Sequence, residues 1–312
     1  MPSENYTQIT EFLLIGFEFF PSVNRFILLL FLVIYIFTIA GNILIILLVS
    51  TYRHLQSPMY FFLSNLSITE ITFTTNIVPN MLKNLLSGGG VISLNGCFTQ
   101  YYFFSSTATT ECILLAVMSY DRCLAICNPL RYASLMNTQL CVHLAVWAWL
   151  AGFIISMFTL ILLYRSSYCG PNTIDSFFCD LTPLIELSCS DMSLVKIESF
   201  LFASLLTLLP FVFIIVTYIL IISTILKIPS SNGRRKAFST CSSHLAVVSV
   251  YYGTLVTMYV VPTQNQRFNI NKALSLLYTV ITPLLNPIIY GLRNKDIHRA
   301  LKAHFKKSYN IT

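Results

Sequence analysis

Charged residues are scarce in this chain. Aspartate, glutamate, lysine and arginine make up 10% of its 312 residues, whereas a soluble domain of this size carries about 25%. Hydrophobic residues account for 55%. This composition excludes most soluble folds, and we expect a polytopic membrane protein of the all-α class.

The N-terminus lacks the marks of a cleaved leader. The opening stretch MPSENYTQITEFLLIGFE is polar and acidic, without a basic segment or a small-residue cleavage site. We therefore expect the first apolar run, which begins near Phe26, to direct the chain into the membrane.

Apolar runs long enough to cross a bilayer, roughly 20 residues or more, recur along the chain. They lie near 26–50, 58–80, 97–127, 140–163, 197–227, 237–261 and 271–292. We expect a seven-helix transmembrane bundle over residues 26–292, with an extracellular tail at 1–25 and a cytoplasmic tail at 293–312.

The lysines and arginines indicate the orientation of the bundle. With the N-terminus outside, all of the 19 basic residues fall on the inner side except Arg25, Lys83, Arg165, Lys196, Arg267 and Lys272. Basic residues gather on the cytoplasmic side of membrane proteins, which favours this orientation. The net charge of +7 therefore lies mainly on the inner face, and no nucleic-acid partner is expected.

Three segments between or after the spans have distinct compositions. The Gly88-Gly89-Gly90 run is expected to be a turn. The outer segment 164–196 is long and polar, and we expect an ordered lid over the outer mouth. In the cytoplasmic tail, Ile297, Leu301 and Phe305 recur every four residues among lysines and arginines, which predicts a short amphipathic helix on the inner leaflet.

Four of the nine cysteines fall on the outer side, which is the oxidising one. They are Cys97, Cys169, Cys179 and Cys189, and they predict two disulfides whose pairing the residues leave open among three possibilities. No CxxC or His–Cys spacing occurs there, so no zinc site is expected. Asn5 begins a glycosylation sequon on the outer tail.

Six blocks of sequence, in order, resemble one family. They are Gly41-Asn42, PMYFFLSNLS (58–67), MSYDRCLAICNPLRY (118–132), the outer cysteines, KAFSTCSSHLAVV (236–248) and PLLNPIIYGLRN (283–294). Together they resemble the vertebrate odorant receptors of the larger, tetrapod-type class, within the rhodopsin-like G-protein-coupled receptors. The resemblance covers nearly the whole chain.

The resemblance implies a receptor and not an enzyme, with no cofactor. Its partners would be a small odorant, membrane lipids and a heterotrimeric G protein of the stimulatory, olfactory type that raises cyclic AMP. The expected location is the plasma membrane, in sensory cilia. The family also implies the disulfide pairs Cys97–Cys179 and Cys169–Cys189.

At the inner end of span three, Asp121 is expected to pair with Arg122 until span six moves outward and frees the arginine for the G protein. The family usually has tyrosine after this arginine, and Cys123 stands there instead. The residues expected to act in activation are Asp121, Arg122, Tyr218, Lys236, Ser239, His244, Asn286, Pro287 and Tyr290.

Two acids lie at mid-membrane depth. Glu111 precedes Arg122 by eleven residues, roughly 16 Å along a helix, and Glu70 lies near the same depth in span two. The resemblance adds Asn42 and Asn286 to this cluster. Two neighbouring carboxylates do not both ionise readily, so the pair would share a proton, hold a cation such as Na⁺, or serve only as a protonated structural contact.

The outer halves of spans three, five, six and seven are expected to enclose the ligand. Helical spacing and the resemblance give Phe104, Ser105, Ala108, Thr109, Cys112, Phe202, Ala203, Leu206, Tyr252, Leu255, Val256, Tyr259, Leu276 and Thr279 as lining residues. This mostly apolar lining suits a small, weakly polar molecule. The outer half of span three lacks an aspartate, so a protonated amine would miss its usual counter-ion there.

Three other functions compete with an odorant receptor. A receptor of the same fold for a non-odorant small molecule outside the nose remains open. A transporter or channel would need a continuous polar lining, and no internal repeat supports one. An intramembrane hydrolase would need a Ser–His or paired-Asp arrangement at mid-depth, which is missing.

Overall fold

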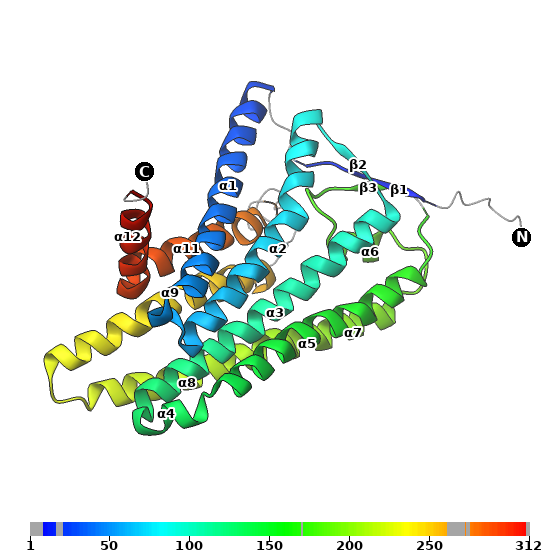
Figure 1. Ribbon diagram of the computed structural model, residues 1–312. Helices are drawn as coiled ribbons and strands as arrows, with labels where there is room; N and C mark the ends of the chain where they lie inside the picture. Colours follow the sequence, from blue (N-terminus) through cyan, green and yellow to red (C-terminus); the bar gives the residue numbers. More distant parts are fainter. Residues whose placement is uncertain (1–8, 17–20, 170, 261–271, 273–274, 310–312) are drawn as a thin grey trace, which may run out of the picture.

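Long helices that run alongside one another form the body of the protein (Figure 1). The computed structural model describes residues 9–16, 21–169, 171–260, 272 and 275–309, so the sequon at Asn5 lies outside the described residues. The long helices are α1 (Pro21–Thr51), α2 (Pro58–Ser87), α3 (Leu94–Cys127), α5 (Thr138–Tyr164), α7 (Ser193–Ala203), α8 (Leu209–Leu226), α9 (Ser231–Val260) and α11 (Thr282–Arg293).

Shorter helices lie at the two ends of the bundle. They are η1 (Arg53–Leu55), α4 (Pro129–Leu135) and α12 (Lys295–Tyr309) at one end, and α6 (Leu181–Glu186) at the other. Local sequence fixes several helix starts: the side chains of Ser93 and Asn137 accept hydrogen bonds from the first-turn amides of α3 and α5, as N-caps do. Gly88 ends α2 in a left-handed conformation with φ of 73°, which glycine adopts without steric cost.

Among the described residues, three segments are long and apolar enough to span a membrane by length and composition alone. They are Arg25–Thr51, Thr138–Tyr164 and Ser193–Leu226. The helices α2, α3 and α9 carry more polar residues, many of them buried. Many polar side chains of these helices face the interior of the bundle. They lower the mean hydropathy of α2, α3 and α9, so a test by composition alone does not detect these helices as spans.

Two π-helical turns interrupt the regular helices. η2 (Ser204–Leu208) joins α7 to α8, and η3 (Leu277–Ile281) leads into α11. Each lies just before a proline, Pro210 or Pro283, which lacks the N–H that the preceding turn would use. At the end of η3, the backbone N–H of Thr282 donates to the Leu277 carbonyl, and the Thr282 hydroxyl donates to the same carbonyl at 3.1 Å. Wider turns of this kind re-aim the side chains they carry.

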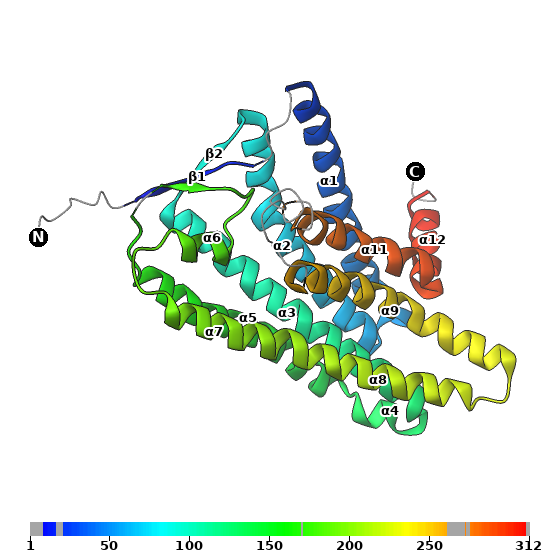
Figure 2. The ribbon, with the colours of Figure 1, turned by 180° about the vertical axis from the view of Figure 1, so that it is seen from behind.

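A small sheet covers the outer end of the bundle, and nothing in the sequence pattern predicted it. Its strands are β1 (Glu11–Leu14), β2 (Gly90–Ser93) and β3 (Thr173–Ile174), with β1 in the centre. β1 runs antiparallel to β2 and parallel to β3. Figure 2 shows the sheet beside α6, at the end where the chain begins. The N-terminal segment, the first outer loop and the long outer loop are therefore joined.

Buried and exposed side chains alternate along β1, which explains why this short strand is stable. Phe12 and Leu14 are fully buried, whereas Leu13 is 37% exposed. The Phe12 ring meets Tyr168 of the long loop edge-on, with 5.8 Å between ring centroids. A further tie comes from Lys272, which forms an ion pair with Asp175 and donates to the Gly16 carbonyl. Segments far apart in sequence thus share a second, outer core.

The predicted amphipathic helix forms as α12. Ile297 and Ala300 are buried, and Leu301 packs against the main core. The Tyr60 hydroxyl of α2 donates to Asn294 at 3.0 Å, just before the helix begins. The basic residues whose side chains are described face outward: Arg299, Lys302 and Lys306 are exposed.

Replacing Phe12 with alanine tests the outer core. Because a fully buried phenylalanine is lost, we expect about 3–5 kcal/mol of destabilisation, with a lower unfolding temperature and reduced surface delivery. Leu13→Ala, one residue along on the exposed face, is the matched control and should have little effect. Equal behaviour of the two variants in thermal unfolding and cell-surface staining would show that β1 does not anchor the outer end.

Candidate functional site

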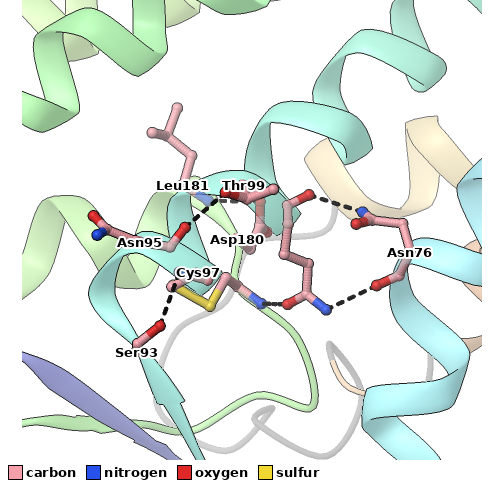
Figure 3. The surroundings of a disulfide bond; sticks show 10 residues. Asn76, Ser93, Asn95, Cys97, Thr99, Asp180 and Leu181 are labelled. Atoms are coloured by element: carbon pink, nitrogen blue, oxygen red, sulfur yellow. Dashed lines mark hydrogen bonds between the residues drawn. A yellow bond between two sulfur atoms is a disulfide. The ribbon is translucent and has the colours of Figure 1, made fainter.

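The outer end of α3 is fixed to the long loop by a disulfide and an amide network. Cys97 bonds Cys179, with their Cα atoms 5.4 Å apart. Gln100 accepts a hydrogen bond from the Cys179 backbone N–H at 2.9 Å and donates to the Asn76 carbonyl of α2 at 3.0 Å. Figure 3 shows Asp180 and Leu181 directly after this bond, beside α3. The network therefore sets the position of both residues.

The second disulfide closes a small ring within the same loop. Cys169 bonds Cys189, with 5.8 Å between their Cα atoms. The backbone N–H of Cys189 donates to the Ser167 carbonyl at 2.9 Å, which brings the two ends of the ring together. Both bonds are the pairs that the family resemblance implied.

A cavity of about 170 Å³ lies beneath this loop. Nine of the predicted ligand residues line it: Phe104, Ser105, Ala108, Thr109, Cys112, Phe202, Ala203, Leu206 and Leu255. Cavities of about 150 Å³ hold a molecule the size of benzene, so the space fits a small ligand. Its lower end is closed by Tyr251, whose hydroxyl lies 3.0 Å from the Cys112 sulfur and donates to the Ala108 carbonyl.

Three of the other predicted ligand residues do not line this cavity. Tyr252 is buried and stacks on Phe211 with ring centroids 4.7 Å apart. Leu276 packs against the main core, and Thr279 is buried with its hydroxyl donating to the Ser275 carbonyl. Val256 and Tyr259 belong to α9, but their side chains are outside the described part of the structure.

Sequence reasoning missed half of the lining. The additional residues are Tyr101, Ile155, Thr159, Asp180, Leu181, Ser199, Thr207, Tyr251 and Tyr278. Two come from α5, which was not expected to contribute, and two come from the loop. The π-helical turns supply Leu206, Thr207 and Tyr278. One signal was available: Asp180 follows a cysteine that is tied to α3, so it had to lie near the outer mouth.

Asp180 is also the N-cap of α6. Its Oδ1 accepts the Leu181 backbone N–H at 2.7 Å. Burial raises the pKa of the Asp180 carboxyl, while this hydrogen bond acts in the opposite direction. The residue therefore combines a capping role with a position on the cavity wall.

The two mid-membrane acids come together in the bundle. Glu70 and Glu111 are almost completely buried and lie within hydrogen-bonding reach of each other. The Asn286 side-chain amide donates to Glu70. Asn42 is also buried, but its amide donates to the Thr38 carbonyl of its own helix. Gly41, directly before Asn42, leaves room for Pro287, whose Cβ would lie 3.0 Å from a Cβ added at Gly41.

At the inner end, Asp121 holds Arg122 in a closed arrangement. The guanidinium donates to Asp121 Oδ2 at 2.7 Å, and the Tyr132 hydroxyl of α4 donates to Asp121 Oδ1, also at 2.7 Å. Both carboxylate oxygens are thus engaged, and Asp121 is fully buried. Two charges in a low-dielectric interior remain there only when they are paired in this way.

Other predicted activation residues surround the ion pair. The Tyr218 hydroxyl lies 2.7 Å from His244 Nδ1, and the two rings stack, which joins α8 to α9. Tyr290 is fully buried, and its hydroxyl has no hydrogen-bond partner among the described residues. Ser239 is exposed on α9, and the Lys236 side chain is outside the described part.

The fold is the seven-helix bundle of the rhodopsin type. The crystal structure of squid rhodopsin superimposes with a TM-score of 0.73 over 94% of this chain and 88% of that chain, at 16% sequence identity. A likeness at this identity establishes the seven-transmembrane fold.

The family follows from sequence comparison. The olfactory receptor family model matches residues 31–308. Olfactory receptor 11L1 of Homo sapiens is 45% identical, covering 100% of this chain and 97% of that protein. Olfactory receptor 10A7 of Homo sapiens is 47% identical over 97% and 96%, and olfactory receptor 6B9 of Mus musculus is 44% identical over 96% and 95%. The chain belongs to the olfactory receptor family, and it is a multi-pass plasma-membrane receptor.

Tyr132→Phe tests the inner ion pair. This change removes the hydrogen bond to Asp121 and leaves the ring, so the closed arrangement loses one charge-assisted contact. We expect basal signalling to rise several-fold at equal surface expression. Tyr120→Phe, which alters an exposed tyrosine of α3, is the control, and an unchanged basal level in Tyr132→Phe would show that the contact does not favour the closed state.

Proposed function

We propose that this protein is an odorant receptor that binds a small, volatile, mostly apolar molecule in the outer cavity and activates a stimulatory, olfactory-type G protein, which raises cyclic AMP. The observation that carries the proposal is the cavity between α3, α5, α7, α9 and the long loop. Aromatic and aliphatic side chains form most of its wall, so burial of hydrocarbon would supply most of the affinity.

The proposal places the bundle, residues 26–292, in the membrane with residues 1–25 outside and residues 293–312 at the inner leaflet. The buried face and exposed basic face of α12 support this placement, because such a helix lies in the interface. The G protein would bind at the inner end, where outward movement of α9 frees Arg122 from its surroundings.

The pair formed by Glu70 and Glu111 would hold a proton or a cation in the closed state. The two buried carboxyl groups interact electrostatically, one oxygen of each has no hydrogen-bond partner among the described residues, and Asn286 donates to Glu70. Carboxylate and amide oxygens also suit a hard cation such as Na⁺. Either occupant would relieve the repulsion that two carboxylates exert at this depth.

Arg122→Ala tests G-protein coupling. In cells with a cyclic-AMP reporter, an odorant panel should produce a concentration-dependent response that this variant abolishes at normal surface expression. Arg131→Ala, an inner arginine exposed on α4, is the control. An ion current or solute uptake that persists without a G protein would overturn the receptor mechanism.

Glu111→Gln and Glu70→Gln test the acid pair. Each variant keeps a side chain of similar shape and removes the coupled charge, so we expect altered basal signalling and a weaker dependence of the odorant response on Na⁺ concentration. Glu186→Gln, in the outer loop, serves as the control. Unchanged basal activity and salt dependence in both buried variants would leave the pair with a structural role only.

A further inference from the structure

The cavity is apolar along its length but acidic at its outer end. Asp180 borders the cavity. Glu198, on α7, lies directly behind the wall, where the Thr159 hydroxyl donates to its Oε1 at 2.8 Å. Among the residues that line the described cavity, none is lysine, arginine or histidine. The charge of these two carboxyl groups therefore meets no basic side chain within the site.

The two carboxyl groups lie near the same part of the cavity wall. Tyr101, Ser105, Thr159 and Asp180 all line the cavity, and Glu198 is joined to this group by its hydrogen bond from Thr159. Ser105 in turn accepts a hydrogen bond from Ser156 at 3.0 Å. The outer end of the cavity is thus a compact polar region bounded by α3, α5, α7 and the loop.

This polar region contains a buried hydrogen-bond acceptor without a donor. The Glu198 Oε2 atom is enclosed and has no hydrogen-bond partner among the described residues. In the same part of the chain, Asp180 accepts its one hydrogen bond, from Leu181, through Oδ1. A buried acceptor without a donor costs free energy. A ligand that supplies an N–H or O–H group would satisfy this acceptor.

We propose that this receptor responds best to small amines, whose ammonium group binds at Asp180 near Glu198 while the hydrocarbon body lies against Phe104, Phe202 and Leu206. The inference rests on the proposed function of the cavity as the ligand site and specifies its ligand class. The outer half of span three lacks an acidic counter-ion, as the sequence indicates, and in this proposal Asp180 of the loop and Glu198 of α7 supply it. A volume of about 170 Å³ admits one six-membered ring with a single polar group.

A matched set of ring compounds tests this assignment. Cyclohexylamine, cyclohexanol, cyclohexanone and cyclohexanecarboxylate share one hydrocarbon body and differ in the polar group. In the cyclic-AMP assay, we expect cyclohexylamine to act at a concentration at least about tenfold below that of cyclohexanone, because a charge-assisted hydrogen bond is worth that much. Cyclohexanol should lie between them, and the carboxylate should be inactive.

Asp180→Asn removes the charge and preserves the helix cap, since asparagine caps as well as aspartate does. It should raise the effective concentration of cyclohexylamine by about tenfold or more and leave that of cyclohexanone unchanged. Glu198→Gln should act in the same direction. Asp191→Asn is the matched control: this exposed aspartate accepts the Ser193 backbone N–H at 2.9 Å and does not line the cavity.

A binding measurement tests the amine assignment independently of G-protein coupling. Cyclohexylamine should raise the unfolding temperature of the purified wild-type receptor more than cyclohexanone does, and this advantage should vanish in Asp180→Asn. Stabilisation without a cyclic-AMP response would keep the amine site and overturn the proposed coupling. If cyclohexylamine neither activates nor stabilises the receptor better than cyclohexanone, or if Asp180→Asn matches Asp191→Asn, the amine assignment is wrong.

Discussion

The bond between Cys97 and Cys179 is the constraint on which the outer half of the receptor depends. It joins two residues 82 positions apart and holds the long loop against α3. Asp180 and Leu181 follow directly, so the bond places a charged and an apolar residue on the cavity wall. The same loop provides β3, which binds the N-terminal strand. Without this bond, the cavity would lose its outer cover and open to water.

The inner half follows a different constraint, which is that hydrocarbon offers no partner for a charge. Asp121 is fully buried because Arg122 and Tyr132 occupy both of its oxygens. Glu70 and Glu111 have no such cation among the described residues, so each depends on the other and on Asn286. The ion pair is therefore neutralised within the chain, whereas the proposed role of the acid pair would have a proton or a cation neutralise it.

The sequence predicts most of the bundle because each span leaves a long apolar run and each loop leaves a polar gap. It does not predict the outer sheet, since β1 is four residues long and is held by Tyr168 and β3 from a distant segment. The cavity is predictable where one helix face supplies it, as with Ala108 and Cys112. It is not predictable at Thr207 or Tyr278, because a π-helical turn shifts the face that a regular helix would present.

Contacts between α3 and α9 connect the cavity with the inner ion pair. Tyr251 binds the Cys112 sulfur and the Ala108 carbonyl at the floor of the cavity. Seven residues earlier on α9, about 10 Å along the helix, His244 stacks on Tyr218 near the ion pair. The one helix α9 thus contributes Tyr251 to the cavity and His244 to the region of the Asp121–Arg122 ion pair. A ligand shifts an equilibrium only by binding one state better. Under the proposed function, an agonist would favour a state in which Tyr251 leaves its present partners, and α9 would carry that displacement to His244.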